Sequence, residues 1–265
     1  MDQIKVLVHG VLGKMGQEVL RAVCRDQELE AVAGVDIKGE TNEIALPNGS
    51  GSVPLSSDLE SAIGCYHPDV LVDFSTAEAT MPAARIAAKQ RVRLVIGTTG
   101  LSTTDLDEIK KLCQSQGLGA VVAANFSLAA ALMIHSAKTA AKFFDYAEII
   151  EMHHEQKADA PSGTALVTAR EMVKSRGKAF AHPLTEKESV PNCRGGQFEG
   201  IALHSIRLPG LLAHQEVVLG APGQTLTIRL DQISREAFMP SVLLSIKKVV
   251  ELKEAVFGLD SILGL

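Results

Sequence analysis

Aromatic side chains are scarce in this chain of 265 residues. It has no tryptophan and two tyrosines, and aromatic residues make up 4% of the sequence. Proteins that bind single-stranded nucleic acid usually stack bases on aromatic rings, so this mode of binding is disfavoured. The formal net charge is −5, and no group of Lys and Arg is dense enough to form a DNA-binding patch. We therefore expect no nucleic-acid partner.

Paired cysteines are also lacking. The four cysteines are far apart: Cys24, Cys65, Cys113 and Cys193. Without a C-x-x-C pair, a zinc ribbon or a redox dithiol is disfavoured, and we expect no metal site. Reduced cysteines are typical of cytosolic proteins, so we expect a cytoplasmic location.

Long apolar runs are few. Residues 1–9 lack the basic segment and long apolar run of a signal peptide. The most membrane-like stretch, residues 117–137, is interrupted by Asn125, Ser127 and His135. This pattern indicates a buried strand that leads into a buried helix rather than a transmembrane span. We expect no association with a membrane.

The first half of the chain alternates apolar runs with amphipathic stretches. Strands are predicted at 4–9, 29–36, 69–74, 93–99 and 120–124. Helices are predicted at 14–26, 57–63 with Ser57 as N-cap, 77–90 and 103–116. Residues 37–57 are predicted to form a loop or a weak edge element. Continuous apolar strands between helices indicate a parallel sheet covered on both faces, which is a Rossmann-like, doubly wound α/β fold.

The second half has a different pattern. Helices are predicted at 127–143, 163–176 and 236–252, and strands at 147–152, 201–208, 214–220 and 224–230. Pro-Gly turns separate the last three strands, which favours an antiparallel or mixed sheet. We expect a dinucleotide-binding domain at 1–126 and 237–265. A second α+β domain with a mixed sheet, at 127–236, is expected to bind substrate and to mediate assembly.

A glycine-rich loop joins the first strand to the first helix. Gly10, Gly13 and Gly16 have the spacing G-x-x-G-x-x-G, and such glycines let a backbone approach a pyrophosphate at a helix N-terminus. Asp36 follows the second strand, where an acid can bind the adenosine ribose. A strand-to-helix turn without a ligand is the alternative, but Asp36 favours a dinucleotide site.

Three further strand ends carry small or polar residues. These are the segments DFST (73–76), GTTG (97–100) and AANFS (123–127). Ligands of open parallel sheets bind at the carboxyl ends of the strands, so these segments are candidates for cofactor contacts. Each could instead be an ordinary turn or helix cap.

The segment EMHHEQKADAPSGTA (151–165) gathers several chemical groups. His153 and His154 follow a strand, and neighbouring strand residues point to opposite sides, so the two imidazoles are expected to differ in role. Lys157 lies close by. The start of the next helix, at Ser162–Thr164, offers free N–H groups and hydroxyls to an anion. The pattern suits a carboxylate substrate that is protonated as it is reduced.

Two other interpretations of this segment are possible. His, Glu and Asp are metal ligands, but the H-x-x-x-H spacing that places two ligands on one helix face is absent. The second interpretation is that the segment is a solvated polar loop with no catalytic or binding role.

The sequence resembles the 4-hydroxy-tetrahydrodipicolinate reductase (dihydrodipicolinate reductase) family. The resemblance rests on VHGVLGKMGQEV, VIGTTG, AANFS, the closing GQTLTIRLDQISREAFMPSVLLSI and above all E-x-H-H-x-x-K-x-D-A-P-S-G-T-A. It implies a Rossmann domain, a mixed-sheet tetramerisation domain and a homotetramer. It also implies that the chain reduces 4-hydroxy-tetrahydrodipicolinate, a small dicarboxylate, to tetrahydrodipicolinate with NADH or NADPH in lysine and diaminopimelate synthesis.

The resemblance also implies roles for particular residues. His153 matches the proton donor and acceptor, and Lys157 a second proton donor. The substrate-binding positions match His154, Ser162, Gly163 and Thr164. The dinucleotide contacts match Gly10, Val11, Leu12, Gly13, Lys14, Met15, Asp36, Gly97, Thr98, Thr99, Ala123, Ala124, Asn125 and Phe126.

Two positions depart from the expected pattern. His9 replaces a small or apolar residue before the glycine loop, and we interpret it as a hydrogen-bonded histidine at a strand end. Ile37 follows Asp36 where NADPH-binding members often have arginine, although Lys14 and Lys38 could each approach a phosphate. Both cofactors are therefore expected to serve.

Other functions remain possible from sequence alone. A different Rossmann oxidoreductase could use the same loop on another imine or carbonyl acid. A semialdehyde dehydrogenase is disfavoured because no cysteine lies in a nucleophile setting. A non-catalytic NAD(H)-sensing module or nucleotide-binding scaffold would need the glycine loop but not His153 or Lys157.

Overall fold

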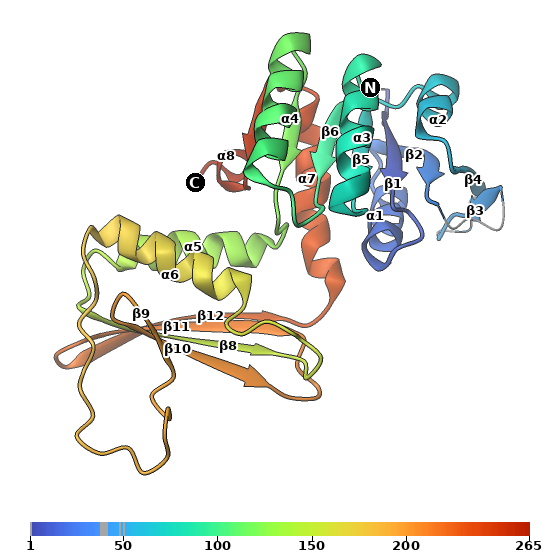
Figure 1. Ribbon diagram of the computed structural model, residues 1–265. Helices are drawn as coiled ribbons and strands as arrows, with labels where there is room; N and C mark the ends of the chain where they lie inside the picture. The colour runs from blue at the N-terminus through green and yellow to red at the C-terminus, as the bar shows by residue number, and fades with distance from the viewer. Residues whose placement is uncertain (1, 38–41, 48, 50) are drawn as a thin grey trace. The chain divides into compact units, whose positions relative to one another are not determined.

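The structure is a computed structural model that describes residues 2–37, 42–47, 49 and 51–265. The chain divides into two compact units. Unit 1 combines Met1–Leu128 with Phe238–Leu265, and unit 2 comprises Ala129–Ala237. Each unit has its own sheet and its own helices (Figure 1).

The sheet of unit 1 has the strand order β13-β7-β6-β5-β1-β2-β4-β3. All its pairs are parallel except β3 with β4. The strands are β1 (Ile4–His9), β2 (Leu29–Val35), β3 (Glu43–Ala45), β4 (Ser52–Ser56), β5 (Val70–Asp73), β6 (Arg93–Ile96), β7 (Ala120–Val122) and β13 (Ala255–Phe257).

Helices cover both faces of this sheet. They are α1 (Lys14–Arg25), α2 (Leu59–Tyr66), α3 (Ala77–Lys89), α4 (Thr103–Gln116), α7 (Met239–Val249) and the short α8 (Asp260–Leu263). Leu7 and Leu71 belong to a core cluster with residues of α2, α3 and α4. Val6 and Val8 point to the opposite face and are fully buried, on the side where α1 and α7 pack together. Burial of both faces explains the continuous apolar strands.

The strand order reverses beside β1. β1 pairs with β5 on one side and with β2 on the other, so the chain winds outward in both directions from this point. Open α/β sheets bind ligands in the crevice outside the carboxyl ends of the strands at such a reversal. The glycine loop, Asp36 and residues 73–76, 97–100 and 123–127 all follow carboxyl ends of these strands.

The sheet of unit 2 is mixed, with the order β12-β11-β8-β10-β9. Its strands are β8 (Tyr146–His153), β9 (Gly196–Phe198), β10 (Ile201–Arg207), β11 (Ala213–Ala221) and β12 (Gln224–Gln232). The helices α5 (Leu128–Ala140) and α6 (Gly163–Arg176) lie over one face of this sheet (Figure 1). Ile149, Leu203 and Val217 form the core with residues of both helices.

The structure confirms the predicted fold class, a doubly wound sheet plus a second unit with a mixed sheet. Several details of the prediction were wrong. The helix predicted at 57–63 begins at Leu59, and its cap is Asp58, whose carboxylate accepts a hydrogen bond of 3.2 Å from the Ser61 N–H. Ser57 is not the cap because Asp58 is one residue closer to the first turn.

Other predicted elements proved shorter or were arranged differently. The strands predicted at 69–74 and 93–99 end at Asp73 and Ile96, where the backbone leaves the ladder. The helix predicted at 236–252 is a 3-10 turn (Arg235–Phe238) followed by α7. The Pro-Gly turn after β10 does not make a hairpin, because β8 lies between β10 and β11. The three-residue strands β9 and β13 were not predicted.

Candidate active site

The glycine loop is tightly folded at the end of β1. Gly10 has φ of +75°, which favours glycine, and a Cβ there would lie 2.7 Å from the carbonyl oxygen of Phe74. A Cβ on Gly16 would lie 2.1 Å from the carbonyl oxygen of Gly10. These two glycines therefore allow the loop to pack against the start of α1 and against the end of β5.

Gly13 is the N-cap of α1 and supplies no side chain to it. The first N–H groups of a helix have no intrahelical acceptor, so this terminus can receive a phosphate. Asp36 lies beside the loop, where its Oδ2 accepts a hydrogen bond of 3.0 Å from the Leu12 N–H. An acid in this position and an uncapped helix N-terminus together fit a dinucleotide.

The other residues of this loop differ in exposure. Val11 is fully buried, and its side chain lies beside Gly34 of β2. Leu12 and Lys14 are exposed, and Met15 is half-buried. Lys38, the second lysine considered for a phosphate contact, lies outside the described residues.

Residues 97–99 follow β6. A Cβ on Gly97 would lie 2.1 Å from the Phe74 ring, so only glycine lets the chain pass here. Thr98 is buried, and its hydroxyl oxygen accepts a hydrogen bond of 3.1 Å from the Ser75 N–H. Thr99 is exposed. The segment thus ties the ends of β5 and β6 together and leaves Thr99 open to a ligand.

Residues 123–126 follow β7. Ala123 is buried, whereas Ala124 and Asn125 are exposed. The Asn125 side-chain oxygen accepts a hydrogen bond of 2.8 Å from the Ser127 N–H, so its NH₂ group remains able to donate. The Phe126 ring is buried, with its centroid 5.8 Å from that of Phe74. The Phe126 ring is therefore not accessible to a ligand.

His9 lies at the end of β1, before the glycine loop. Its Nδ1 lies 3.1 Å from Oδ1 of Asp73, which is 1% exposed at the end of β5. The contact places His9 beside a buried carboxylate at the strand end, but its Nδ1 lacks hydrogen-bond geometry, so the predicted hydrogen bond is not observed.

In unit 2, the predicted proton donor His153 is the last residue of β8. Its side chain is 15% exposed, and its Nδ1 lies 2.5 Å from Oε2 of Glu151, two residues earlier on the same face. Burial is the main reason that the pKa of His153 is lowered from its usual value of 6.5; the Glu151 carboxylate opposes this, and Lys157 and Arg207 add to it. His154 lies just beyond the strand and is half-buried.

The loop after His154 brings Lys157 close to the histidine. The Lys157 N–H donates a hydrogen bond of 3.2 Å to the His154 carbonyl, which closes a turn. Its ammonium lies 2.6 Å from Oδ1 of Asp159, and this ion pair keeps the pKa of Asp159 below its usual value. Lys157 is thus held beside His153, with part of its side chain still accessible to solvent.

The helix α6 begins at the end of this loop. Ser162 is its N-cap: the hydroxyl oxygen accepts a hydrogen bond of 3.2 Å from the Ala165 N–H, and the side chain is buried. The space beside Gly163 is open, since a Cβ there would meet no atom within 4 Å. Thr164 follows on the first turn. The N–H groups of this turn form a site for an anion.

Unit 2 therefore brings together all six predicted catalytic and substrate-binding residues, and unit 1 gathers the predicted dinucleotide contacts at the ends of four parallel strands, β1, β2, β6 and β7. Sequence reasoning missed Glu151 and Arg207 as partners of His153. The letter E of the E-x-H-H pattern was a signal for Glu151. Arg207 is 56 residues from Glu151, and only the pairing of β10 with β8 brings it close to Glu151 and opposite His153.

Comparisons with known proteins cover nearly the whole chain. Residues 4–126 match the family model described as dihydrodipicolinate reductase, N-terminus, and residues 129–263 match that of the C-terminus. The chain belongs to the dihydrodipicolinate reductase family. Proteins of this family are NAD(P)H-dependent oxidoreductases, and the chain is therefore an oxidoreductase that uses NADH or NADPH.

Individual relatives agree with this membership. The chain is 54% identical over its full length to a 4-hydroxy-tetrahydrodipicolinate reductase of Dehalococcoides mccartyi, with 100% of both chains covered. It is 48% identical to the reductase of Moorella thermoacetica over 98% of each chain. The dipicolinate-bound dihydrodipicolinate reductase of Paenisporosarcina sp. TG-14 is 40% identical and has a TM-score of 0.88, over 98% of this chain and 99% of that one.

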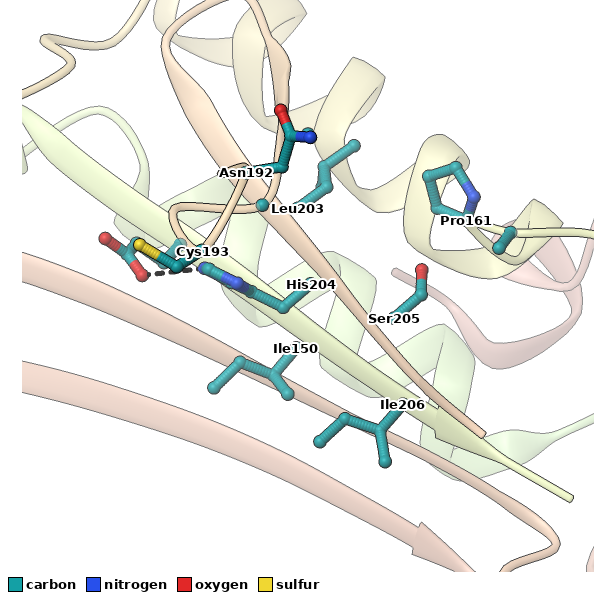
Figure 2. A pocket seen from close by; sticks show the side chains of 12 residues that line it. Ile150, Pro161, Asn192, Cys193, Leu203, His204, Ser205 and Ile206 are labelled. Atoms are coloured by element: carbon teal, nitrogen blue, oxygen red, sulfur yellow. Dashed lines mark hydrogen bonds and ion pairs between the residues drawn. The ribbon is translucent and has the colours of Figure 1, made fainter. Parts of the chain in front are cut away.

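A cavity of about 820 Å³ lies along β10 of this family member. Figure 2 shows that its lining includes His204, Cys193 and Pro161. His204 Nε2 lies 3.0 Å from Oε2 of Glu148, which also lines the cavity. Pro161 belongs to the loop before α6, but His153, Lys157 and Thr164 do not line the cavity. We therefore assign the chemistry to the loop and not to this cavity.

Two features are absent from the described ranges. No helix in them is long and apolar enough to cross a membrane. Nor do three or more His, Cys, Asp or Glu side chains within them come together in a group that could hold a metal ion.

Proposed function

We propose that this chain reduces 4-hydroxy-tetrahydrodipicolinate to tetrahydrodipicolinate, with loss of water, in the synthesis of diaminopimelate and lysine. Family membership over the whole chain supports the reaction. The observation that carries the proposal is the loop from Glu151 to Thr164, which places a histidine, a lysine and a helix N-terminus together. The biosynthetic role of the relatives supports a cytoplasmic location.

The substrate is a dicarboxylate, and unit 2 offers it two kinds of contact. The N–H groups of Gly163 and Thr164 and the Thr164 hydroxyl can donate to one carboxylate at the start of α6. His154 and Lys157 supply further donors, and Lys157 supplies a positive charge. Ser162 supports these contacts because its buried side chain caps the helix.

Protonation of the substrate is assigned to His153, with Lys157 as the second donor. A bound nicotinamide supplies the hydride of the reduction. His153 is suited to proton transfer because an imidazole can both gain and lose a proton; burial lowers its pKa, and the Glu151 carboxylate opposes that shift. Lys157 lies beside it, and Asp159 holds the ammonium in place.

The dinucleotide is assigned to unit 1. The N-terminus of α1 would hold the pyrophosphate, with Gly10, Gly13 and the exposed Lys14 around it. Asp36 would accept hydrogen bonds from the ribose. The remaining contacts are assigned to the ends of β6 and β7: Gly97, Thr98, Thr99, Ala123, Ala124, Asn125 and the backbone of Phe126.

The test is the oxidation of NADH or NADPH by the purified protein, followed at the nicotinamide absorbance band after freshly generated substrate is added. A panel of acyclic oxo acids and of cyclic imines with one carboxylate serves as the comparison. We expect the dicarboxylate to have the highest kcat/KM. Preference for an oxo acid, or cofactor binding without oxidation by any of these compounds, would overturn the proposal.

A further inference from the structure

Glu151 is a buried carboxylate that the proposed reaction has not used. Its side chain is 1% exposed, and it lies on β8 beneath the start of α6. One oxygen, Oε2, lies 2.5 Å from His153 Nδ1 and accepts a hydrogen bond of 2.9 Å from Arg207 Nη1. The other, Oε1, accepts hydrogen bonds of 2.8 Å from Arg207 Nη2 and 3.2 Å from the Ser162 N–H.

Strand pairing accounts for this arrangement. The parallel register of β10 and β8 places Ser205 opposite Glu151 and Arg207 opposite His153. All four side chains are on the face of the sheet that α6 covers, because residues two apart in a strand share a face. Arg207 also donates a hydrogen bond of 2.6 Å to the Asp159 carbonyl, so the same guanidinium fixes the loop that carries Lys157.

The carboxylate of Glu151 is ionised. Burial by itself would raise the pKa of Glu151, but hydrogen bonds from Arg207, Ser205 and His153 more than offset burial and lower the pKa. An ionised carboxylate accepts hydrogen bonds and cannot donate them. The short contact with His153 Nδ1 therefore requires that Nδ1 carries a hydrogen in the neutral imidazole as well as in the imidazolium.

We propose that Glu151 is a positioning residue: it holds His153 as the Nδ1–H tautomer, leaves Nε2 as the atom that exchanges a proton with the substrate, and stabilises the imidazolium. The proposal rests on the proposed function for the role of His153. It also explains why the carboxylate is buried beside a histidine. A buried arginine–carboxylate pair contributes little net stability, whereas a carboxylate at Nδ1 orients an imidazole for proton transfer.

The charges around His153 determine in which direction its pKa changes when Glu151 is replaced. Arg207 of β10 and Lys157 of the loop disfavour the imidazolium, Asp159 is paired with Lys157, and Glu151 favours the imidazolium. His153 donates a proton from its charged form, so activity falls as the pH rises through its pKa. Removal of the Glu151 charge lowers this pKa further, so the fall in activity moves to lower pH.

The variant Glu151→Gln tests these statements. It keeps the size of the side chain but cannot present acceptors to both His153 and Arg207. We expect kcat to fall at least about tenfold with little change in substrate KM, and the descending limb of the kcat/KM profile to shift to lower pH. A folded variant with wild-type kcat and an unshifted profile would overturn the proposal.

Glu148→Gln is the matched control. Glu148 lies on the same strand and also contacts a histidine and an arginine, with distances of 3.0 Å to His204 and 2.7 Å to Arg194. Its side chain points to the opposite face, because it is an odd number of residues from Glu151. We expect this variant to keep the wild-type kcat and pH profile.

A spectroscopic measurement tests the proposed tautomer of His153 even if Glu151→Gln does not fold. The nitrogen-15 spectrum of the wild-type protein, above the pKa of His153, distinguishes the two imidazole tautomers. The signal is assigned among the eight histidines by its loss in His153→Gln. We expect Nδ1–H, and Nε2–H would refute the proposal. Because this readout needs no substrate, failure of the proposed reaction and failure of the Glu151 role are distinguishable.

Discussion

Thr164 is the residue that tests substrate anchoring most simply. It lies on the first turn of α6, and its hydroxyl is a candidate donor to a substrate carboxylate. Thr164→Val keeps the shape and removes the hydroxyl. A hydrogen bond to a charged group is worth about 1.5–3 kcal/mol, so we expect the substrate KM to rise about 10- to 150-fold.

The control is Thr164→Ser, which keeps the hydroxyl and should have a KM close to that of the wild type. Steady-state kinetics with the substrate varied at saturating NADH provides both values. An unchanged KM in Thr164→Val would mean that the carboxylate binds elsewhere.

We expect Asp36 and its neighbours to set the preference between the two cofactors. Asp36 can bind a free ribose and repels the phosphate of NADPH, while Ile37, which follows it, is 86% exposed and offers no charge. The positive charges of Lys14 and Lys38 are expected to offset this in part, by an amount that salt reduces. We expect both cofactors to serve, with NADH equal to NADPH or better by about tenfold or less.

The measurement is kcat/KM for each cofactor at low and high ionic strength. Lys38→Ala should impair NADPH more than NADH, and the difference should shrink with salt, because salt screens exposed charges. A preference for NADPH of about a hundredfold or more would contradict the role given to Asp36.

At the residue scale, the sequence predicted site residues where the chemical groups lie close together along the chain. Gly10, Asp36, His153 and Lys157 could each be selected from spacing and from the strand or helix that follows them. Arg207 could not, because its contact with Glu151 depends on which strand pairs with β8. The buried ring of Phe126 could not be foreseen either, since it packs on Phe74 from a distant strand end.

At the element scale, the first turn of α6 contributes both to the stability of the protein and to the proposed substrate site. Ser162 caps this helix, so Ser162→Ala should lower the free energy of unfolding by about 1 kcal/mol. The first turn would then be less well ordered, and the substrate KM should rise. Urea unfolding and steady-state kinetics of the same preparation check both effects.

Ser102→Ala is the control for this prediction. Ser102 caps α4 in unit 1 with a capping box, so its loss should reduce stability by a similar amount and leave the substrate KM unchanged. If the substrate KM rises no more in Ser162→Ala than in Ser102→Ala, the Ser162 cap does not contribute to substrate binding, and the prediction is wrong.

Helices and long strands could be predicted from periodicity, but pairing could not. α4 and α6 have the predicted bounds because Ser102 and Ser162 cap them and Gly117 and Gly177 end them. β9 and β13 have three residues each, too few for a recognisable period. Their partners, β10 and β7, hold them in the sheets.

At the scale of the whole molecule, the sheet of unit 2 makes the chain a candidate for assembly. Helices α5 and α6 lie over one face of the sheet (Figure 1). Tyr146 and Ile206 on its strands are 43% and 40% exposed. An exposed apolar sheet face tends to bind a partner, and the family resemblance implies four copies. We expect a homotetramer, with a mass by light scattering about four times that of one chain. A monomer at micromolar concentration would contradict this expectation.

The most direct test of the account is the turnover of His153→Gln. Positioned acid–base catalysis is worth about 10²- to 10⁴-fold, so we expect kcat to fall by this amount. The affinity for NADH, measured by fluorescence titration, should remain close to that of the wild type, because the glycine loop and Asp36 belong to unit 1. Turnover near the wild-type value in this variant would remove His153 from the mechanism. It would also contradict the assignment of the loop from Glu151 to Thr164 as the catalytic centre.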